Sequence, residues 1–166
     1  MAKLKLHGNP IDTNNNLPEI GSKAIDFCLT DNKLQDHYLS NFIGKKVLLN
    51  IYPSIDTGVC AMSVRKFNEE ASRLPNVAVL GISRDLPFAL GRFCGAEGIE
   101  KLITLSELRN RDFGKDYGLE IVNGPMAGLL ARAVIIIDET GKIAYTELVE
   151  DIVMEPNYQA ALLKLQ

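Results

Sequence analysis

Long apolar segments are absent from this sequence, and so are a surplus of basic residues and a recognisable signal segment. No stretch approaches the ~18 apolar residues that a membrane-spanning helix needs, so we expect no membrane contact. The net charge of −3 and the isoelectric point near 5.4 argue against nucleic-acid binding, which requires a basic face. No apolar segment follows the first lysines, as a signal peptide would require, and this predicts a cytoplasmic protein.

Cysteine and histidine are scarce as well. The three cysteines are an odd number and include no Cys-x-x-Cys pair. They therefore fit neither the disulfide framework of a small secreted protein nor a thioredoxin-type dithiol. The two histidines, His7 and His37, do not stand at metal-ligand spacing from any cysteine. We predict neither a metal site nor another cofactor.

What is present is an ordinary globular composition, with 46% hydrophobic and 23% charged residues. A chain of 166 residues can bury about two-thirds of its unfolded surface around one core. The sequence has no internal repeat, low-complexity segment or Gly/Ser linker. Residues 1–166 are therefore predicted to form a single domain.

The apolar pattern changes between strand and helix periods and predicts an α/β protein. Leu4 and Leu6 alternate with lysines ahead of a Gly-Asn-Pro turn, which predicts an N-terminal hairpin over residues 3–13. Further strands are expected at 24–30, 34–39, 47–52, 77–83, 103–105, 133–138 and 143–148, and helices at 57–73, 86–94, 111–117 and 157–165. The strand 47–52, its helix and the strand 77–83 form a βαβ unit, so these two strands should be parallel.

Cys60 lies where this βαβ unit passes from strand to helix. The strand before it has one polar residue among six, as in a buried central strand. From Cys60 onward the apolar residues recur on one helix face, at Cys60, Val64, Phe67, Ala71 and Leu74. Cys60 is thus expected in the first turn of a helix, where free N–H groups and the dipole favour an anion. A helix N-terminus is one of the few settings that lower the pKa of a cysteine thiol and make it a nucleophile.

A cysteine on an apolar helix face also fits simple core packing, because free cysteine is among the residue types most often buried. Three neighbours favour a reactive role instead. Pro53 cannot continue a central strand and shapes the loop before the helix. The hydroxyl of Thr57, three residues before Cys60, can reach both the sulfur and a substrate oxygen. Gly58 permits close approach of the backbone to a bound molecule.

The pattern Pro53-x-x-x-Thr57-x-x-Cys60 resembles the active-site motif of the peroxiredoxins, thiol enzymes that reduce hydroperoxides. Three stretches are similar to the bacterial thiol peroxidase subfamily, the atypical two-cysteine peroxiredoxins: 54–67 (SIDTGVCAMSVRKF), 92–97 (RFCGAE) and 129–133 (LLARA). The similarity extends from Gly8 to the last helix. It implies a thioredoxin-like fold, with a central mixed sheet flanked by helices and an N-terminal β-hairpin.

The resemblance implies roles for two further residues. Arg132 matches an arginine that contacts the reactive sulfur and the peroxide, although an arginine before a buried strand also fits a water-exposed strand edge. Cys94 matches the resolving cysteine, which forms an intramolecular disulfide with Cys60, although by itself it also fits a packed helix cysteine. No role is implied for Cys28, which we interpret as structural. Arg65 is predicted to be a solvated helix residue.

A fixed cation near Cys60 is also required by the energetics. Keeping a cysteine mostly ionised at pH 7 takes roughly 2–3 kcal/mol of selective stabilisation of the thiolate. A helix N-terminus supplies about 0.3–1 kcal/mol, or ~2 kcal/mol when partly buried. Arg132 is the candidate for the remainder, because its guanidinium stays charged and offers several fixed donors.

The resemblance implies a thiol-dependent peroxidase that reduces hydrogen peroxide and organic hydroperoxides. Cys60 would attack the peroxide, Thr57 and Arg132 would hold it, Pro53 would shield the site, and Cys94 would close the intramolecular disulfide. Thioredoxin is the expected reductant, and a homodimer is the usual state of relatives. One alternative is a non-enzymatic redox sensor built on the same cysteines. A redox-inert binding module is another, but it would leave Thr57 and Arg132 without a role.

Overall fold

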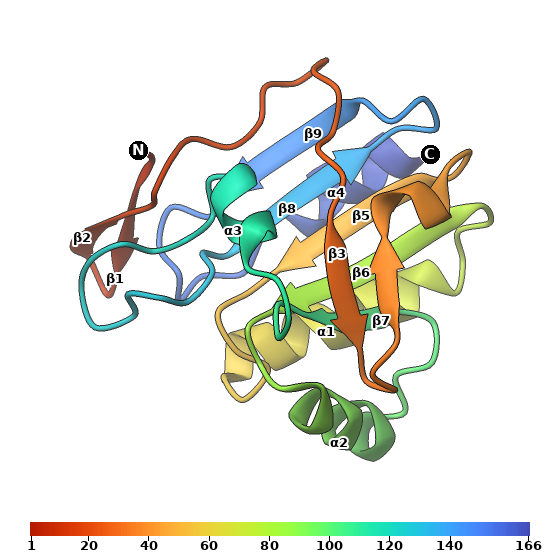
Figure 1. The fold of residues 1–166 in the computed structure, drawn as a ribbon, viewed down its shortest axis with the longest axis horizontal. Helices are drawn as coiled ribbons and strands as arrows, with labels where there is room; N and C mark the ends of the chain where they lie inside the picture. The colour runs from red at the N-terminus through yellow and green to blue at the C-terminus, as the bar shows by residue number, and fades with distance from the viewer.

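Seven strands form one mixed sheet across the centre of the molecule, in the order β4-β3-β7-β6-β5-β8-β9 (Figure 1). The computed structural model describes residues 1–166. The strands of this sheet are β3 (Cys28–Asp31), β4 (Asp36–Tyr38), β5 (Lys46–Ile51), β6 (Val77–Ser83), β7 (Ile103–Ser106), β8 (Ala133–Ile137) and β9 (Ile143–Leu148). A separate hairpin pairs β1 (Lys3–Leu6) with β2 (Asn9–Asp12).

The centre of the sheet is the predicted βαβ unit. Strand β5 is parallel to β6, and β6 is parallel to β7, whereas the remaining pairs are antiparallel. Helix α1 (Gly58–Ala71) connects β5 to β6. From Val47 to Ile51 the strand β5 is buried throughout, as its nearly unbroken apolar run predicted. The carboxyl ends of β5 and β6 therefore lie side by side beneath the start of α1.

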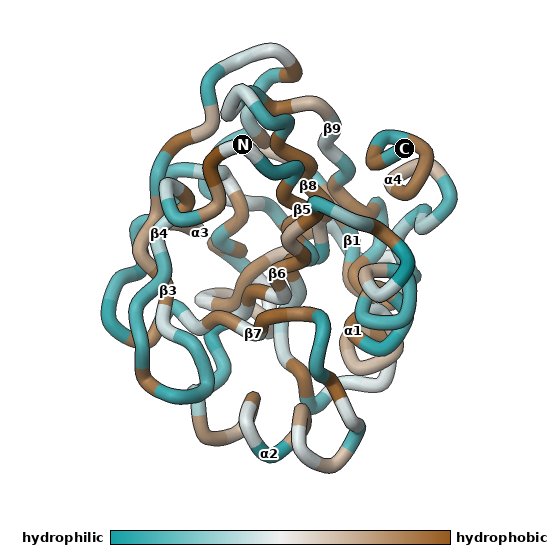
Figure 2. The backbone as a smooth tube through the Cα atoms, turned by 90° about the vertical axis from the view of Figure 1, so that its right-hand side faces the viewer, coloured by the Kyte–Doolittle hydropathy of each residue, from teal (hydrophilic) through white to brown (hydrophobic).

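Helices cover both faces of the sheet. Three of them, α1, α2 (Pro87–Glu97) and α4 (Tyr158–Leu165), pack on one face and α3 (Asp112–Asp116) on the other, where the short 3-10 helix Leu39–Phe42 also lies (Figure 1). The hydropathy colouring is brown along the central strands and largely teal toward the outer turns (Figure 2). None of the four α-helices is both long enough and apolar enough to cross a bilayer.

The N-terminal hairpin packs beside the segment that leads into β8. Leu4 and Ile11 form a small apolar cluster with Ile121, Ala131 and Ile152. Backbone hydrogen bonds also join β1 to residues 150–152: the Lys5 N–H donates to the Glu150 carbonyl at 2.7 Å, and the Ile152 N–H donates to the Lys5 carbonyl at 2.9 Å. The hairpin thereby fixes the backbone around Ile152.

The strand predicted at 24–30 begins only at Cys28. Before it, the Ala24 N–H donates to the Gly141 carbonyl, at the turn between β8 and β9, rather than to a neighbouring strand. Ile25 is 44% exposed, so the alternation of Ile25 with Phe27 and Leu29 is not a strand face. The prediction was wrong for these first residues because a hydrogen bond to a turn replaces pairing with a neighbouring strand.

The strand predicted at 34–39 is also shorter than expected. The Asp31 carboxylate accepts hydrogen bonds from the Lys33 and Gln35 N–H groups at 2.8 and 2.9 Å. This side-chain-stabilised turn places Leu34 at a φ of 66°, outside the extended region. Strand β4 consequently spans only Asp36–Tyr38.

Candidate active site

Cys60 lies in the first turn of α1, as predicted. Strand pairing continues one residue past β5, because the Tyr52 N–H donates to the Ile82 carbonyl at 3.1 Å, and Pro53 then ends it. Thr57 is the N-cap of α1, with extended backbone angles. The Cys60 side chain is fully buried, at 0% exposure, and packs in the apolar cluster between the sheet and the helices.

Two side chains donate hydrogen bonds toward the Cys60 sulfur. Thr57 Oγ1 lies 2.6 Å from Sγ, and Arg132 Nη2 lies 3.2 Å from it. Thr57 makes no side-chain cap to the helix N–H groups, although capping is the usual role of threonine at this position. The hydroxyl faces the sulfur instead. Both contacts favour a thiolate over a thiol, because a thiolate is the stronger hydrogen-bond acceptor.

Arg132 is 2% exposed, so the interpretation of this arginine as a water-exposed strand edge is wrong. Its Nε donates to the Ile152 carbonyl at 2.7 Å, which is the carbonyl held in place by the N-terminal hairpin. Its third nitrogen, Nη1, is buried without a hydrogen-bond partner. The guanidinium is thus fixed at one end, touches the sulfur at the other, and keeps one donor free beside it.

These contacts supply the stabilisation that the helix dipole lacks. A hydrogen bond to a charged group contributes about 1.5–3 kcal/mol, and the dipole at a buried helix N-terminus adds up to ~2 kcal/mol. Both act against the desolvation of a fully buried sulfur, which disfavours its charged form. The geometry of Thr57 and Arg132 therefore fits a sulfur kept as a nucleophilic thiolate.

Cys94 lies in α2 and is 9% exposed. Its sulfur is 3.5 Å from the Thr104 hydroxyl on β7, and the side chain belongs to the same apolar cluster as Cys60. Arg65 links the two cysteine helices, because its guanidinium makes a bidentate ion pair with Glu97 of α2 at 2.8 and 2.9 Å. Arg65 is half exposed, as a solvated helix residue should be, but this contact between helices was not predicted. All three cysteines are free.

Comparison with known proteins decides the family. The Redoxin family model matches residues 19–162. A thiol peroxidase of Corynebacterium glutamicum is 52% identical over 165 residues, which is 99% of each chain. The chain belongs to the thiol peroxidases of the Redoxin family. The prediction drawn from the motifs around Cys60, Cys94 and Arg132 is thereby confirmed at the level of the family.

Solved structures agree with the fold. A peroxiredoxin-like protein from Aquifex aeolicus superimposes with a TM-score of 0.95 at 36% identity, covering 99% of this chain and 96% of that one. A thiol peroxidase from Chromobacterium violaceum has the same fold, with a TM-score of 0.90 at 24% identity and coverage of 99% and 95%. The predicted thioredoxin-like arrangement of a mixed sheet, flanking helices and an N-terminal hairpin is confirmed.

The loop between β5 and α1, residues 53–57, is held by a carboxylate that the sequence did not single out. Asp85, which follows β6, accepts hydrogen bonds from the Ser54 hydroxyl and the Ile55 N–H, both at 2.7 Å. The Ser83 hydroxyl donates to the same carboxylate at 2.7 Å. A signal was available, because polar residues that end a strand parallel to β5 must lie beside the loop that follows β5. The Ser54 oxygen also accepts a hydrogen bond from the Asp56 N–H at 3.2 Å, so this serine helps to shape the loop.

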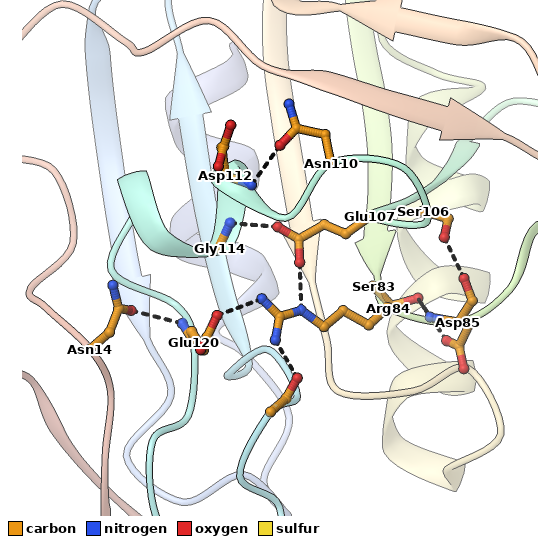
Figure 3. A network of polar contacts seen from close by, with 11 residues as sticks. Asn14, Ser83, Arg84, Asp85, Ser106, Glu107, Asn110, Asp112, Gly114 and Glu120 are labelled. Atoms are coloured by element: carbon orange, nitrogen blue, oxygen red, sulfur yellow. Dashed lines mark hydrogen bonds and ion pairs between the residues drawn. The ribbon is translucent and has the colours of Figure 1, made fainter.

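Arg84, between Ser83 and Asp85, points the other way and joins three segments (Figure 3). Its Nε donates to Glu107 at 2.5 Å, its Nη2 donates to Glu120 at 2.7 Å, and its Nη1 donates to the Gly128 carbonyl. Glu107 also accepts from the Gly114 N–H at 2.6 Å. Residues 120 and 128 belong to the segment that runs into Arg132, so this network holds that segment against the end of β6.

Arg84→Met is expected to lower the free energy of unfolding by about 3 kcal/mol, because it leaves the buried Glu107 carboxylate without a counter-ion. The side chains of Arg84 and Glu107 are 5% and 0% exposed. Urea unfolding of the single variant and of Arg84→Met/Glu107→Gln measures the effect. The double variant should recover part of the loss, since the glutamine oxygen can still accept from the Gly114 N–H. Equal stability of Arg84→Met and wild type would contradict this account of the network.

Other groups of interest lie away from Cys60. Cys28 pairs with Tyr38 between β3 and β4 and lines a surface cavity of about 220 Å³, apart from the other two cysteines. A second cavity of about 310 Å³ is lined by residues that include Lys23, Leu39 and Thr140. No three His, Cys, Asp or Glu side chains gather in the geometry of a metal site.

Proposed function

We propose that this chain is a thiol-dependent peroxidase whose Cys60 thiolate reduces hydrogen peroxide and organic hydroperoxides. One observation carries the proposal: two donors, Thr57 Oγ1 and Arg132 Nη2, point at a buried sulfur, while Arg132 Nη1 remains unpartnered next to it. The family to which the chain belongs supports the same chemistry.

In the first step the Cys60 thiolate attacks the terminal oxygen of the hydroperoxide. The S–O bond forms as the O–O bond breaks, the sulfur is oxidised to a sulfenic acid, and the leaving alkoxide or hydroxide takes up a proton. Negative charge moves from the sulfur to the leaving oxygen during this step. Arg132 Nη1 and Thr57 Oγ1 are the donors placed to stabilise that charge, and they need no reorganisation to do so.

The surroundings of the sulfur fit this role. Pro53 is buried and Thr57 is exposed, so the threonine marks the side from which a small hydroperoxide reaches the site. Water is otherwise excluded from the sulfur by the apolar cluster. In such a site hydrogen bonds to a developing charge are stronger than in water. Pro53 is proposed as the shield of the pocket.

In the second step Cys94 resolves the sulfenic acid by forming an intramolecular disulfide with Cys60. Both cysteines pack in one apolar cluster, one from the first turn of α1 and the other from the last turns of α2. We expect the first turn of α1 to unwind as the sulfurs meet, because a disulfide requires Cα atoms within about 7 Å. Thioredoxin is the proposed reductant, acting through a mixed disulfide. The proposed assembly is a homodimer.

A coupled assay with hydrogen peroxide and cumene hydroperoxide tests the activity. Peroxide consumption should be catalytic when thioredoxin, its reductase and NADPH are present, and limited to one equivalent per chain when they are left out. Replacement of thioredoxin by a glutaredoxin system tests the proposed reductant. Consumption that never exceeds one equivalent with any dithiol would favour a redox sensor over an enzyme.

Cys94→Ser separates the two steps. This variant should still reduce one equivalent of peroxide, because Cys60 needs no partner to attack it. Turnover with thioredoxin should fall sharply, and the sulfenic acid should accumulate and then be overoxidised to sulfinic acid. Mass spectrometry of the Cys60 peptide measures both products. Normal turnover of Cys94→Ser would contradict the assignment of the resolving cysteine.

A further inference from the structure

Tyr52 carries a fully buried hydroxyl without a hydrogen-bond partner. Its side chain is 0% exposed, and its Oη is one of three buried side-chain atoms that remain unpaired. The other buried phenols are satisfied: for example, Tyr117 Oη donates to the Ile25 carbonyl at 2.6 Å. An unpaired buried hydroxyl lowers stability, so the hydroxyl of Tyr52 requires an explanation.

The ring of Tyr52 packs on the same face of the sheet as Cys60 and Cys94. Tyr52 follows β5, and its Oη would lie 3.1 Å from a Cβ atom placed on Gly81 of the neighbouring strand β6. Gly81 pairs in turn with Thr104 of β7, whose hydroxyl is 3.5 Å from the Cys94 sulfur. Strands β5 and β6 lie side by side in Figure 1, and β7 pairs with the other edge of β6. The Tyr52 hydroxyl thus lies against β6, one strand away from the threonine that contacts Cys94, in the apolar cluster that contains both cysteines.

Cys94 lacks the features that favour a thiolate at Cys60. It lies toward the carboxyl end of α2, where the helix dipole disfavours an anion. Its only side-chain hydrogen-bond contact is Thr104 Oγ1 at 3.5 Å, and the sulfur is nearly buried. Yet Cys94 must ionise to attack, since the thiolate is the nucleophile in disulfide formation.

We propose that the Tyr52 hydroxyl donates a hydrogen bond to the Cys94 thiolate while the disulfide forms. The inference rests on the proposed two-cysteine mechanism. In this step the Cys94 thiolate attacks the sulfenic sulfur of Cys60, the S–S bond forms, and the S–O bond breaks. The electron pair leaves with the oxygen, which takes a proton and departs as water. The Tyr52 hydroxyl, which has no partner in the resting state, thereby gains an acceptor, and the Cys94 thiolate gains a donor.

Tyr52 is suited to donate because it stays protonated. Burial, and then the charges of Asp85, Cys60 and Cys94, raise the pKa of Tyr52 well above its ordinary value. The nearby Ser83 hydroxyl acts in the opposite direction on this pKa, although its one proton is donated to the Asp85 carboxylate at 2.7 Å. The phenol therefore remains a neutral donor.

Tyr52→Phe removes only this oxygen, and stopped-flow measurement of the two steps tests its role. Sulfenic acid formation at Cys60 should keep its wild-type rate, whereas disulfide formation at pH 7 should become about three- to tenfold slower. The pH midpoint of the disulfide step should rise by about one unit or more. A less stabilised thiolate is the better nucleophile, so the variant should overtake wild type at high pH. A purely structural effect would not make the two profiles cross.

Two controls make the test decisive. The urea midpoint of Tyr52→Phe should rise, because the hydroxyl is unpaired in the resting protein. Tyr117→Phe, a buried tyrosine on the opposite face of the sheet, should change neither step. Identical pH profiles for Tyr52→Phe and wild type would overturn the inference, and so would equal slowing of both steps. If wild type itself forms no Cys60–Cys94 disulfide, the underlying two-cysteine mechanism fails, which is a separate result.

Discussion

Cys60→Ser is expected to abolish peroxide reduction, to below about one per cent of the wild-type rate, in both single-turnover and coupled assays. A serine hydroxyl remains protonated at neutral pH, so neither Thr57 nor Arg132 can turn it into an anionic nucleophile. The measurement is the rate of hydrogen peroxide loss at equal concentrations of both proteins. Circular dichroism verifies the fold of the variant.

Cys28→Ser is the matched control for this loss. Cys28 lies on β3 beside Tyr38 and shares no cluster with Cys60 or Cys94. Its replacement should leave both steps close to wild type. Substantial turnover in Cys60→Ser, or a large loss in folded Cys28→Ser, would show that the wrong sulfur has been assigned.

Arg132→Lys is expected to slow the reaction of Cys60 with peroxide by about a hundredfold, the usual effect of losing one oriented donor at a developing oxyanion. Lysine keeps the positive charge, but it cannot bind the Ile152 carbonyl and the sulfur at once through a planar fork. The pH midpoint for alkylation of Cys60 should also rise. Second-order rate constants and alkylation profiles, both in a Cys28→Ser/Cys94→Ser background, measure the two effects.

Arg109→Lys provides the comparison. Arg109 is half exposed and pairs with Asp36 on the β3–β4 hairpin, away from the sulfur. This substitution should change neither the rate nor the alkylation profile. An Arg132→Lys variant that behaves in the same way would mean that the guanidinium next to Cys60 has no part in the reaction.

The position of Cys60 could be predicted from sequence because a single local pattern determines it. A buried strand, a proline and a helical apolar face succeed one another within one βαβ unit, so the start of the helix is fixed by short-range constraints. The hydroxyl of Thr57 falls within the same helical turn as the sulfur. Both predictions needed no knowledge of distant segments.

The role of Arg132 depended on the family resemblance, because its burial comes from long-range contacts. Its Nε is bound by the Ile152 carbonyl, and Ile152 is held in place by Lys5 of the N-terminal hairpin. Every residue has a backbone carbonyl, so the sequence does not reveal which carbonyl binds Arg132. The segments involved are also far apart in sequence. Pattern alone therefore could not separate a buried arginine from one at a strand edge.

The supports of the site were missed for a similar reason. Asp85 acts across parallel strands, and its partners depend on the register of β5 against β6, which the sequence pattern does not specify. The first residues of the strand predicted at 24–30 show the opposite error. The alternation of Ile25 and Phe27 is typical of a strand, but the Ala24 N–H bonds to the Gly141 carbonyl, and this segment does not pair with a neighbouring strand.

A redox sensor and a peroxidase would use the same cysteines, and they differ in the fate of the disulfide once it has formed. A sensor would hold the disulfide and change its contacts with a partner, whereas a peroxidase returns to the dithiol with each reductant encounter. A redox-inert binding module fits least, because it gives no reason for two donors directed at a buried sulfur. Steady-state turnover with a dithiol separates the first two.

Cys60 and Cys94 of one chain are expected to form a disulfide in response to peroxide. The most direct test is to mix the reduced protein with one equivalent of hydroperoxide, quench with acid, alkylate the free thiols and map the peptides without reduction. We expect a Cys60–Cys94 linkage, an alkylated Cys28, and a monomeric band on a non-reducing gel. A bridge that contains Cys28, or a disulfide between two chains, would contradict it.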